Sequence, residues 1–319
     1  MKRSLRDSRR KHWIQLAFRI LRLHIRPQVD PLEILIGNYN KIASDFDKNW
    51  TQYAHGASDE LIQRLPLFNG ARCLDLCCGT GYATMRIFEK TAGETIGVDA
   101  SQAMLDLAKT NCPDSCRFIQ EDALVFLHKQ PKDSFDFITC IWALGYFPPR
   151  KFLAEIYRVL RPCGYLGIID HSRHSNHKMV ALAYQVFAEN PTYLTFKLRS
   201  YYLKNSLMLV RKMRRCGFSV RDSWDSTMTF YEPDADTAIT RLLRTGSGLG
   251  GLDFMMDEKN RQDFFYRYEQ LIEEQCRTTR GIPIKYKIFA AVGAKQCISS
   301  RIKNERPVTN SQCYIISFP

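Results

Sequence analysis

The feature that most constrains this chain is a strand, turn and helix pattern at residues 71–83, with the sequence ARCLDLCCGTGYA. An apolar run typical of a buried strand ends in Asp75, and small residues then lead into a helical pattern. Gly79 and Gly81 permit backbone conformations that a Cβ would block, and they allow the backbone to approach a ligand closely. Another acid, Asp99, ends the next apolar run about 20 residues on, where it can bind the two hydroxyls of a ribose. Together these features predict a turn that binds an adenosine-type ligand.

Helical and strand patterns alternate from residue 31 onward. Strands are expected at residues 71–76, 95–98, 117–120, 135–142, 165–169, 217–230 and 285–293. Helices are expected at residues 38–50, 59–65, 83–90, 103–110, 150–160, 181–189, 204–216, 237–245 and 258–278, with Ser101 as the N-cap of the fourth. Strands separated by helices of this length predict an α/β protein with a doubly wound, mostly parallel sheet of seven strands and right-handed crossovers.

The domain organisation follows from where this alternation weakens. A basic helix is expected at residues 1–30, the core at 31–174 and 217–297, and a helical cap formed by inserts at 175–216 and 231–284. A glycine-rich turn at residues 246–251 suits a hinge within the cap. Residues 298–319 carry no periodic pattern and are expected to form a mobile tail.

The turn at residues 71–83 has alternative interpretations. A dinucleotide fold for NAD or FAD shares the turn and the ribose acid, but it needs a third glycine, and Thr84 stands in that place. A ligand without a pyrophosphate does not need the helix to approach so closely. A glycine pair alone would also fit a structural turn that binds no ligand.

From about residue 39 to residue 170 the chain resembles the class I S-adenosylmethionine-dependent methyltransferases, and within them the quinone-biosynthesis and other small-molecule enzymes. Five segments carry the resemblance in order: LDLCCGTG at 74–81, IGVDAS at 96–101, EDA at 121–123, FDFITCIWAL at 135–144 and EIYRVLRPCG at 155–164. The chain departs from the family at Cys77 and Cys163, where glycine is commoner. The resemblance implies a Rossmann-like methyltransferase fold with a helical cap, and S-adenosyl-L-methionine as the cofactor.

The resemblance also implies a role for each matching residue. Asp75, Gly79 and Gly81 would surround the methionine part of the donor, and Asp99 would bind the ribose. The adenine and the cleft would be lined by Ala100 and Met104 on one adenine face, Asp122 at the exocyclic amine with Ala123 beside it, and Ile141 and Trp142 where the strand ends. Tyr39 would close over the donor as a lid, or serve as a core aromatic residue.

Methyl transfer from a sulfonium is an in-line displacement, so positioning can supply much of the catalysis and a dedicated base is optional. If the acceptor must lose a proton, His171 is the best candidate, because it follows the fifth strand at the carboxyl edge of the sheet. His174 and His177 are nearby alternatives, and a polar loop without a catalytic role is the other interpretation. No metal site is expected, because the 11 cysteines lack the paired spacing of a zinc site.

The predicted function is transfer of a methyl group to a small organic acceptor that is apolar or aromatic. Aromatic residues of the cap could line its pocket or simply pack between helices: Tyr184, Phe187, Tyr193, Phe196, Tyr201 and Tyr202. Two alternatives stay open. One is methylation of RNA, favoured by the basic residues between 199 and 221, although no RNA-binding module is recognisable and nucleic acid is the less favoured partner. The other is a donor-binding protein without catalytic activity.

The net charge of +13 is concentrated outside the core. Residues 1–30 hold nine Lys or Arg and two Asp, and residues 13–26 place an apolar set near one helical face: Trp13, Ala17, Ile20, Leu21 and Ile25. This predicts a basic amphipathic helix that contacts a membrane surface, or else packs on the domain or on a second subunit of an oligomer. Cysteines within apolar runs and the lack of a cleavable signal favour a reducing, cytoplasmic location, with peripheral membrane contact left open.

Overall fold

The computed structural model describes residues 2–25, 31–196, 200–246, 252 and 255–297. The predictions for Arg26, for residues 247–251 of the glycine-rich turn and for the tail at 298–319 lie outside these residues.

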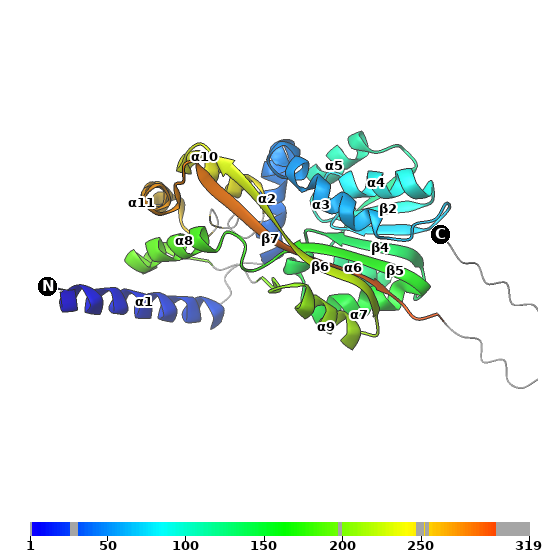
Figure 1. Ribbon diagram of the computed structural model, residues 1–319, viewed down its shortest axis with the longest axis horizontal. Helices are drawn as coiled ribbons and strands as arrows, with labels where there is room; N and C mark the ends of the chain where they lie inside the picture. The colour runs from blue at the N-terminus through cyan, green and yellow to red at the C-terminus, as the bar shows by residue number, and fades with distance from the viewer. Residues whose placement is uncertain (1, 26–30, 197–199, 247–251, 253–254, 298–319) are drawn as a thin grey trace, which may run out of the picture.

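A sheet of seven strands forms the centre of the described chain (Figure 1). Its strands are β1 (Cys73–Leu76), β2 (Thr95–Asp99), β3 (Cys116–Gln120), β4 (Phe135–Ile141), β5 (Leu160–His171), β6 (Ser219–Glu232) and β7 (Ile282–Ala294). They lie in the order β3-β2-β1-β4-β5-β7-β6, and β7 runs antiparallel to both of its neighbours while the other pairs are parallel. The prediction of a doubly wound, mostly parallel sheet is confirmed.

Helices cover both faces of this sheet. They are α1 (Lys2–Ile25), α2 (Pro31–Phe46), α3 (Gln52–Gln63), α4 (Tyr82–Thr91), α5 (Gln102–Asn111), α6 (Ala123–Lys129), α7 (Pro149–Val159), α8 (His177–Glu189), α9 (Ser206–Arg215), α10 (Ala235–Arg244) and α11 (Glu258–Cys276), with shorter helices η1 (Asp47–Thr51), η2 (Leu144–Tyr146) and η3 (Pro191–Tyr193). Helix α6 is not predicted from the sequence, because its seven residues are too few for a clear helical period. Among the described residues, no helix is both long and apolar enough to cross a bilayer.

The strands are buried on both faces because helices pack on each side of a parallel sheet. Alternate residues therefore enter two different cores: Leu74 and Leu76 of β1 lie in one, and Cys73 lies in the other. Helix α9 packs into the first of these cores through Leu209 and Met213. Thus α9, which falls in a segment assigned to the cap from sequence, covers the sheet.

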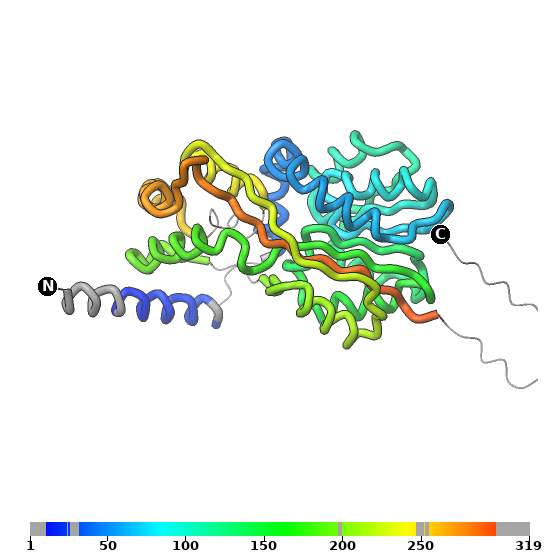
Figure 2. The backbone as a smooth tube through the Cα atoms, viewed as in Figure 1, coloured from blue at the N-terminus to red at the C-terminus, as the bar shows by residue number. Residues whose placement is uncertain are grey.

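Strands β6 and β7 form a long antiparallel pair that runs across the molecule (Figure 2). Glu232 pairs with Ile282 at one end, so α10 and α11 lie in the insert between these two residues. Helix α11 packs against α8, with the rings of Phe187 and Phe264 4.6 Å apart. This helical group stands beyond the carboxyl ends of the parallel strands.

A disulfide joins Cys163, near the start of β5, to Cys297, just after β7. The sequence does not predict this bond, because cysteines within apolar runs favour a reducing location, where disulfides are rare. Cys163 adopts a φ of 65°, the left-handed region that favours glycine. This explains why glycine is commoner at the position: the turn before the parallel part of β5 requires that conformation.

Candidate functional site

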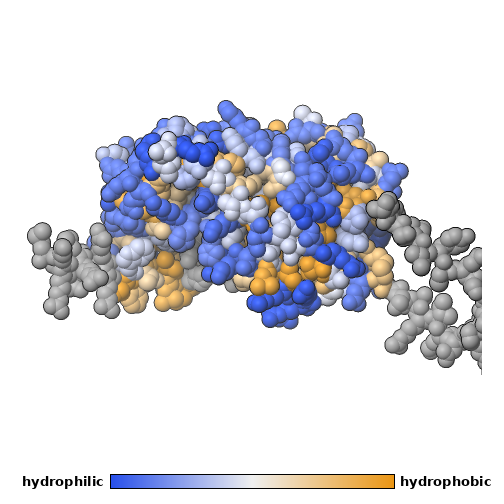
Figure 3. Space-filling view, viewed as in Figure 1, coloured by the Kyte–Doolittle hydropathy of each residue, from blue (hydrophilic) through white to orange (hydrophobic). Residues whose placement is uncertain are grey.

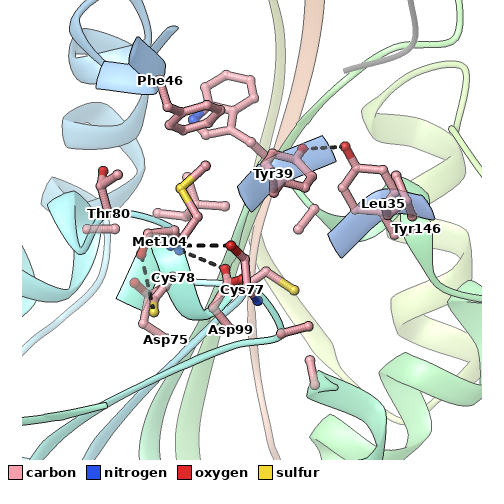
Figure 4. Close-up of a pocket in the computed structure, with 18 of the residues that line it drawn as sticks. Leu35, Tyr39, Phe46, Asp75, Cys77, Cys78, Thr80, Asp99, Met104 and Tyr146 are labelled. Atoms are coloured by element: carbon pink, nitrogen blue, oxygen red, sulfur yellow. Dashed lines mark hydrogen bonds between the residues drawn. The ribbon is translucent and has the colours of Figure 1, made fainter. Parts of the chain in front are cut away.

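A cavity of about 420 Å³ opens at the carboxyl edge of β1, β2, β4 and β5. This is the edge at which open α/β sheets bind ligands. Figure 4 shows the turn after β1, with Cys77 and Cys78, facing Leu35, Tyr39 and Phe46 of α2 across the cavity. Residues of η1 also line the cavity. All eleven cofactor residues expected from the sequence except Gly81 line the cavity: Tyr39, Asp75, Gly79, Asp99, Ala100, Met104, Asp122, Ala123, Ile141 and Trp142.

The turn after β1 has left-handed backbone at three positions, with φ of 57° at Cys77, 55° at Gly79 and 88° at Gly81. A Cβ at Gly79 would meet no atom within 4 Å, because this residue faces the open cavity. A Cβ at Gly81 would lie 2.8 Å from the sulfur of Cys112 and 3.2 Å from the Cα of Ala108. Gly79 therefore leaves room for a ligand, whereas Gly81 permits α4 and α5 to pack closely and does not itself line the cavity.

Asp99 fixes this turn and the next one. Its Oδ2 accepts a hydrogen bond from the backbone N–H of Gly79 at 2.9 Å, and its Oδ1 accepts one from Ser101 at 2.9 Å. Burial raises the pKa of Asp99, and the backbone hydrogen bonds oppose that shift. Because each carboxylate oxygen has further lone pairs, Asp99 can still accept hydrogen bonds from the two hydroxyls of a ribose.

Asp75 is almost fully buried at the end of β1. Its Oδ1 accepts a hydrogen bond from Thr139 Oγ1 and its Oδ2 accepts one from Thr84 Oγ1, both at 2.7 Å. Burial raises the pKa of this carboxyl to about 6, although the two threonine hydroxyls oppose the shift. Thr84, which replaces the third glycine of a dinucleotide motif, thus holds the acid that the turn presents to the cavity.

The wall next to β2 and β3 combines an apolar surface with one acid. Met104 is buried on α5, whose N-cap is Ser101, as the sequence predicted. Asp122 is the N-cap of α6 and accepts hydrogen bonds from Leu124 and Val125 through Oδ1. The other carboxylate oxygen, Oδ2, does not take part in these N-cap hydrogen bonds and can accept one from the exocyclic amine of an adenine.

The end of β4 is held in place by the N-terminal helices. Trp142 adopts a φ of 64° and donates a hydrogen bond from Nε1 to Ser58 Oγ on α3, at 3.0 Å. Its ring meets that of Trp50 edge to face, with centroids 5.3 Å apart. Trp50 lies on η1 and also lines the cavity.

Tyr39 belongs to a group that connects three elements over the cavity. Its hydroxyl lies 2.6 Å from that of Tyr146 on η2, and the Tyr146 hydroxyl donates to the carbonyl of Gly246 at 3.1 Å. A Cβ at Gly246 would lie 2.5 Å from the Tyr39 ring, so Gly246, two residues after the end of α10, packs directly on that ring. Burial raises the pKa of both tyrosines above the ordinary value, so both stay protonated as hydrogen-bond donors. This position fits a cover over the donor.

His171 lies at the end of β5, is buried and lines the same cavity. Its Nδ1 lies 2.9 Å from Asp170 Oδ1, while Asp170 Oδ2 accepts a hydrogen bond from the N–H of Gly145 at 2.8 Å. Among the described residues neither ring nitrogen of His171 has a hydrogen-bond partner, so the contact between Nδ1 and Asp170 is one of proximity alone. His174 and His177 do not line the cavity, so only His171 of the three candidates is at the site.

Most of the aromatic wall comes from residues that the sequence analysis did not select. Phe46, Trp50, Tyr146 and Phe147 line the cavity, whereas Tyr201 is the sole member of the six cap aromatics to do so. Tyr184, Phe187 and Tyr193 pack in the helical core, as the simple packing interpretation expected. The one usable signal was the aromatic content of residues 46–53 and 146–147, close to the recognised segments.

No Lys or Arg side chain lines the cavity among the residues that the structure describes. The acids on its wall are Asp75, Asp99 and Asp122, all on the side of the glycine turn. The same described residues hold no cluster of His, Cys, Asp or Glu that could bind a metal ion.

The fold and this site define a class of protein. Residues 73–164 match a protein-family model described as a methyltransferase domain. These residues therefore carry a methyltransferase domain, and the sheet and its cavity resemble those of the class I S-adenosylmethionine-dependent methyltransferases, a class whose cofactor is S-adenosyl-L-methionine.

Individual relatives agree with that assignment. The demethylmenaquinone methyltransferase of Lactococcus lactis is 31% identical over 163 residues, which are 48% of this chain and 64% of that protein. The chain thus spans less than two thirds of that relative. The trans-aconitate 2-methyltransferase of Shigella dysenteriae is 27% identical over 241 residues, 72% of this chain and 90% of that protein. The crystal structure of YcgJ from Bacillus subtilis shares the fold, with a TM-score of 0.52 at 20% identity, over 76% of this chain and 99% of that one.

Proposed function

We propose that this protein transfers the methyl group of S-adenosylmethionine to a small, uncharged acceptor that is apolar or aromatic. The observation that carries the proposal is the composition of the cavity wall. Away from the glycine turn it is built from aromatic and aliphatic side chains, among them Leu35, Trp50, Tyr146 and Phe147, and no described Lys or Arg lines it. An acceptor with carboxylates or phosphates would lose its hydration there without gaining a cation.

The donor occupies the half of the cavity that contains the three acids. In this arrangement Asp99 binds the ribose hydroxyls, Asp122 the adenine amine and Asp75 the methionine part, with Gly79, Ala100, Met104 and Ala123 in apolar or backbone contact. Ile141 and Trp142 separate this half from the acceptor side, and Tyr39 covers both. The three acids also suit a donor that carries positive charge on sulfur.

The reaction is a displacement at carbon. An electron pair on an oxygen, nitrogen or carbon atom of the acceptor attacks the methyl carbon, the bond from that carbon to sulfur breaks, and the sulfur keeps the bonding pair as a neutral thioether. An acceptor that loses a proton would transfer it to Nε2 of His171, and the Asp170 carboxylate, 2.9 Å from Nδ1, would stabilise the positive charge that the ring gains. The ring of Tyr202 packs against the imidazole, with centroids 4.4 Å apart.

The two kinds of relative predict different acceptors, and the wall favours one of them. Trans-aconitate carries three carboxylates, whereas demethylmenaquinone is an apolar aromatic ring system. The cavity described here suits the second kind of molecule. The basic helix α9, which favoured RNA in the sequence analysis, packs on the sheet with its buried face and does not line the cavity.

The experiment is turnover of S-adenosylmethionine with a panel of acceptors, detected by mass of the methylated product. We expect turnover with uncharged aromatic hydroxyl compounds or quinols and none with polycarboxylates. His171→Gln should lower kcat by roughly 10²–10⁴ for acceptors that lose a proton, with unchanged donor affinity. Turnover with polycarboxylates but not with uncharged aromatics would refute the acceptor class, and donor binding without turnover on any acceptor would favour the non-catalytic alternative.

We also propose, separately from the reaction, that the segment at residues 13–26 contacts a membrane surface. The alternative is that this helix contacts the same helix of a second copy of the protein.

A further inference from the structure

Helix α1 has two apolar faces that point in opposite directions. At about 100° per residue, Leu16, Ile20 and Leu23 fall on one side and Ile14, Phe18, Leu21 and Ile25 on the other. The single apolar face expected from the sequence, which combined Ile20 with Leu21 and Ile25, is therefore wrong.

The inner face attaches α1 to the rest of the protein. Leu16 is 1% exposed, and Ile20 and Leu23 pack against the same core as α8 and α11. Arg19 adds a hydrogen bond from Nε to the carbonyl of Leu194, at 2.8 Å. Because this side is occupied, the orientation of the helix is fixed and its other side must face away from the protein.

The outer face is exposed along three turns. Ile14 is 48% exposed, Phe18 67%, Leu21 56% and Ile25 71%, and these four residues, the outer stripe, lie within an arc of roughly 60°. Figure 3 shows the corresponding apolar patch along α1 at the lower left of the molecule. Single exposed apolar residues are ordinary, but a continuous stripe on a fixed helix marks an interaction surface.

Charge identifies the kind of partner. Lys11 and Arg22 are exposed and border the outer stripe on one side. Residues 1–30 as a whole contain nine Lys or Arg and two Asp. A second copy of α1 would bring two such positive segments together, whereas an anionic lipid surface would neutralise them and accept the apolar side chains.

We infer that α1 lies in the surface of an anionic membrane, with Ile14, Phe18, Leu21 and Ile25 at the boundary of the acyl chains. This arrangement rests on the proposed function in one respect: an apolar acceptor concentrates in a bilayer, where a protein held at the membrane surface can reach it. The chain supports this arrangement, since Leu32, at the start of α2, is 37% exposed and lines the cavity. Only residues 26–31 separate it from the outer stripe, a span of at most about 25 Å.

The test is sedimentation of the full-length protein with vesicles of phosphatidylcholine alone or mixed with phosphatidylglycerol. It is made without donor or acceptor, so that it does not depend on methyl transfer. We expect binding to the mixed vesicles that weakens with salt, and a loss of roughly tenfold or more in the partition coefficient for Phe18→Ser combined with Leu21→Ser. Lys11→Gln with Arg22→Gln should weaken binding to the mixed vesicles and leave binding to neutral ones unchanged.

The matched control is Leu207→Ser combined with Tyr266→Ser, because these residues are 52% and 65% exposed on α9 and α11. This variant should bind vesicles like the unmodified protein. The inference is overturned if the unmodified protein ignores anionic vesicles at low salt, or if both double variants lose binding equally. It is also overturned if the protein is a dimer that the outer-stripe variant dissociates and that does not bind vesicles. Loss of turnover with vesicle binding intact would count against the proposed reaction alone.

Discussion

At the scale of single residues, the chain places a carboxylate where its charge is costly and surrounds it with hydroxyl donors. Asp75 is 1% exposed, and Thr84 and Thr139 each donate to one of its oxygens. The threonines limit the cost of burial but do not cancel it, since the pKa of Asp75 is raised from 3.8 to about 6. The folded protein without donor therefore binds a proton at Asp75 more tightly than the unfolded chain does.

A raised folded pKa makes Asp75 favour the folded state most strongly below the unfolded pKa of 3.8, and this contribution is lost as the pH rises through about 6. Two pKa units correspond to roughly 3 kcal/mol. Asp75→Asn cannot titrate, so the stability difference between this variant and the original protein should change by about that amount between pH 4 and pH 7. Urea denaturation of the donor-free protein at a series of pH values measures it. A constant difference across this range would show that Asp75 titrates as it does in the unfolded chain.

Asp99 is predicted to be the main polar contact of the donor. Asp99→Ala should weaken the binding of S-adenosylmethionine by about 1.5–3 kcal/mol, because it removes hydrogen bonds between a carboxylate and two hydroxyls. Titration calorimetry measures the change, with Asp114→Ala, an exposed acid outside the cavity, as the control. Asp99 also accepts hydrogen bonds from the N–H groups of Gly79 and Ser101, so part of the lost affinity would come from a displaced turn. Asp99→Asn keeps one acceptor oxygen and should therefore lose less affinity. An unchanged affinity in Asp99→Ala would exclude the ribose assignment.

The sequence identified these acids because each ends an apolar strand next to a recognisable turn. It could not identify Trp50 or Tyr146, which reach the same cavity from η1 and η2. Their proximity depends on how the N-terminal helices pack over the sheet, and no local pattern encodes that packing. For Cys77, the departure from glycine was visible, but the φ of 57° that explains the usual glycine was not.

At the scale of elements, the glycine turn joins β1 to α4 and also sets how closely α5 can approach. Gly81 is the N-cap residue of α4 with a φ of 88°, and a Cβ there would meet Cys112 and Ala108. Gly56 provides a contrast, because it is exposed within α3 and a Cβ there would meet nothing within 4 Å.

Gly81→Ala should therefore destabilise the protein by about 1–3 kcal/mol through backbone strain and crowding, and weaken donor binding through the displaced turn. Gly56→Ala should be neutral or stabilise by up to about 1 kcal/mol, because alanine is the better helix former. Thermal denaturation and donor titration of both variants provide the comparison. Equal effects of the two substitutions would mean that the turn at Gly81 relaxes freely.

Elements with a clear period were predicted well, and the errors have physical causes. The strands of the parallel core fall within three residues of their predicted starts except β5, which begins at Leu160 where the helix before it was expected to end. The apolar residues of α1 gave one averaged face because a sequence does not show which side of a helix is covered. In the structure α8 and Leu194 occupy the inner side and leave the outer stripe exposed.

At the scale of the whole molecule, the end of the antiparallel strand β7 is attached to the core beside the start of β5, the last parallel strand. The disulfide Cys163–Cys297 links the start of β5 to the end of β7 across 134 residues of sequence. Next to it, Lys295 Nζ contacts Asp133 at 2.6 Å and donates to the carbonyls of Tyr157 and Leu160 at 2.9 and 2.7 Å. The segment enclosed by this bond contains α8 to α11 and the long β6–β7 pair, so the cap is attached to the core at both of its ends.

The last prediction concerns that attachment. A disulfide across so long a loop restricts the unfolded chain, and losing it should cost about 2–4 kcal/mol of unfolding free energy. Reductant and Cys163→Ser should lower the midpoint of urea denaturation equally. Reductant should have no further effect on the variant. Cys216→Ser, at a partly exposed free cysteine, should leave both the midpoint and its response to reductant unchanged. Thiol titration of the denatured protein should find two fewer thiols before reduction than after it. If the protein denatured without reductant shows the same thiol count as the reduced one, Cys163 and Cys297 are free, and only Lys295 and the strand pairing hold the end of β7.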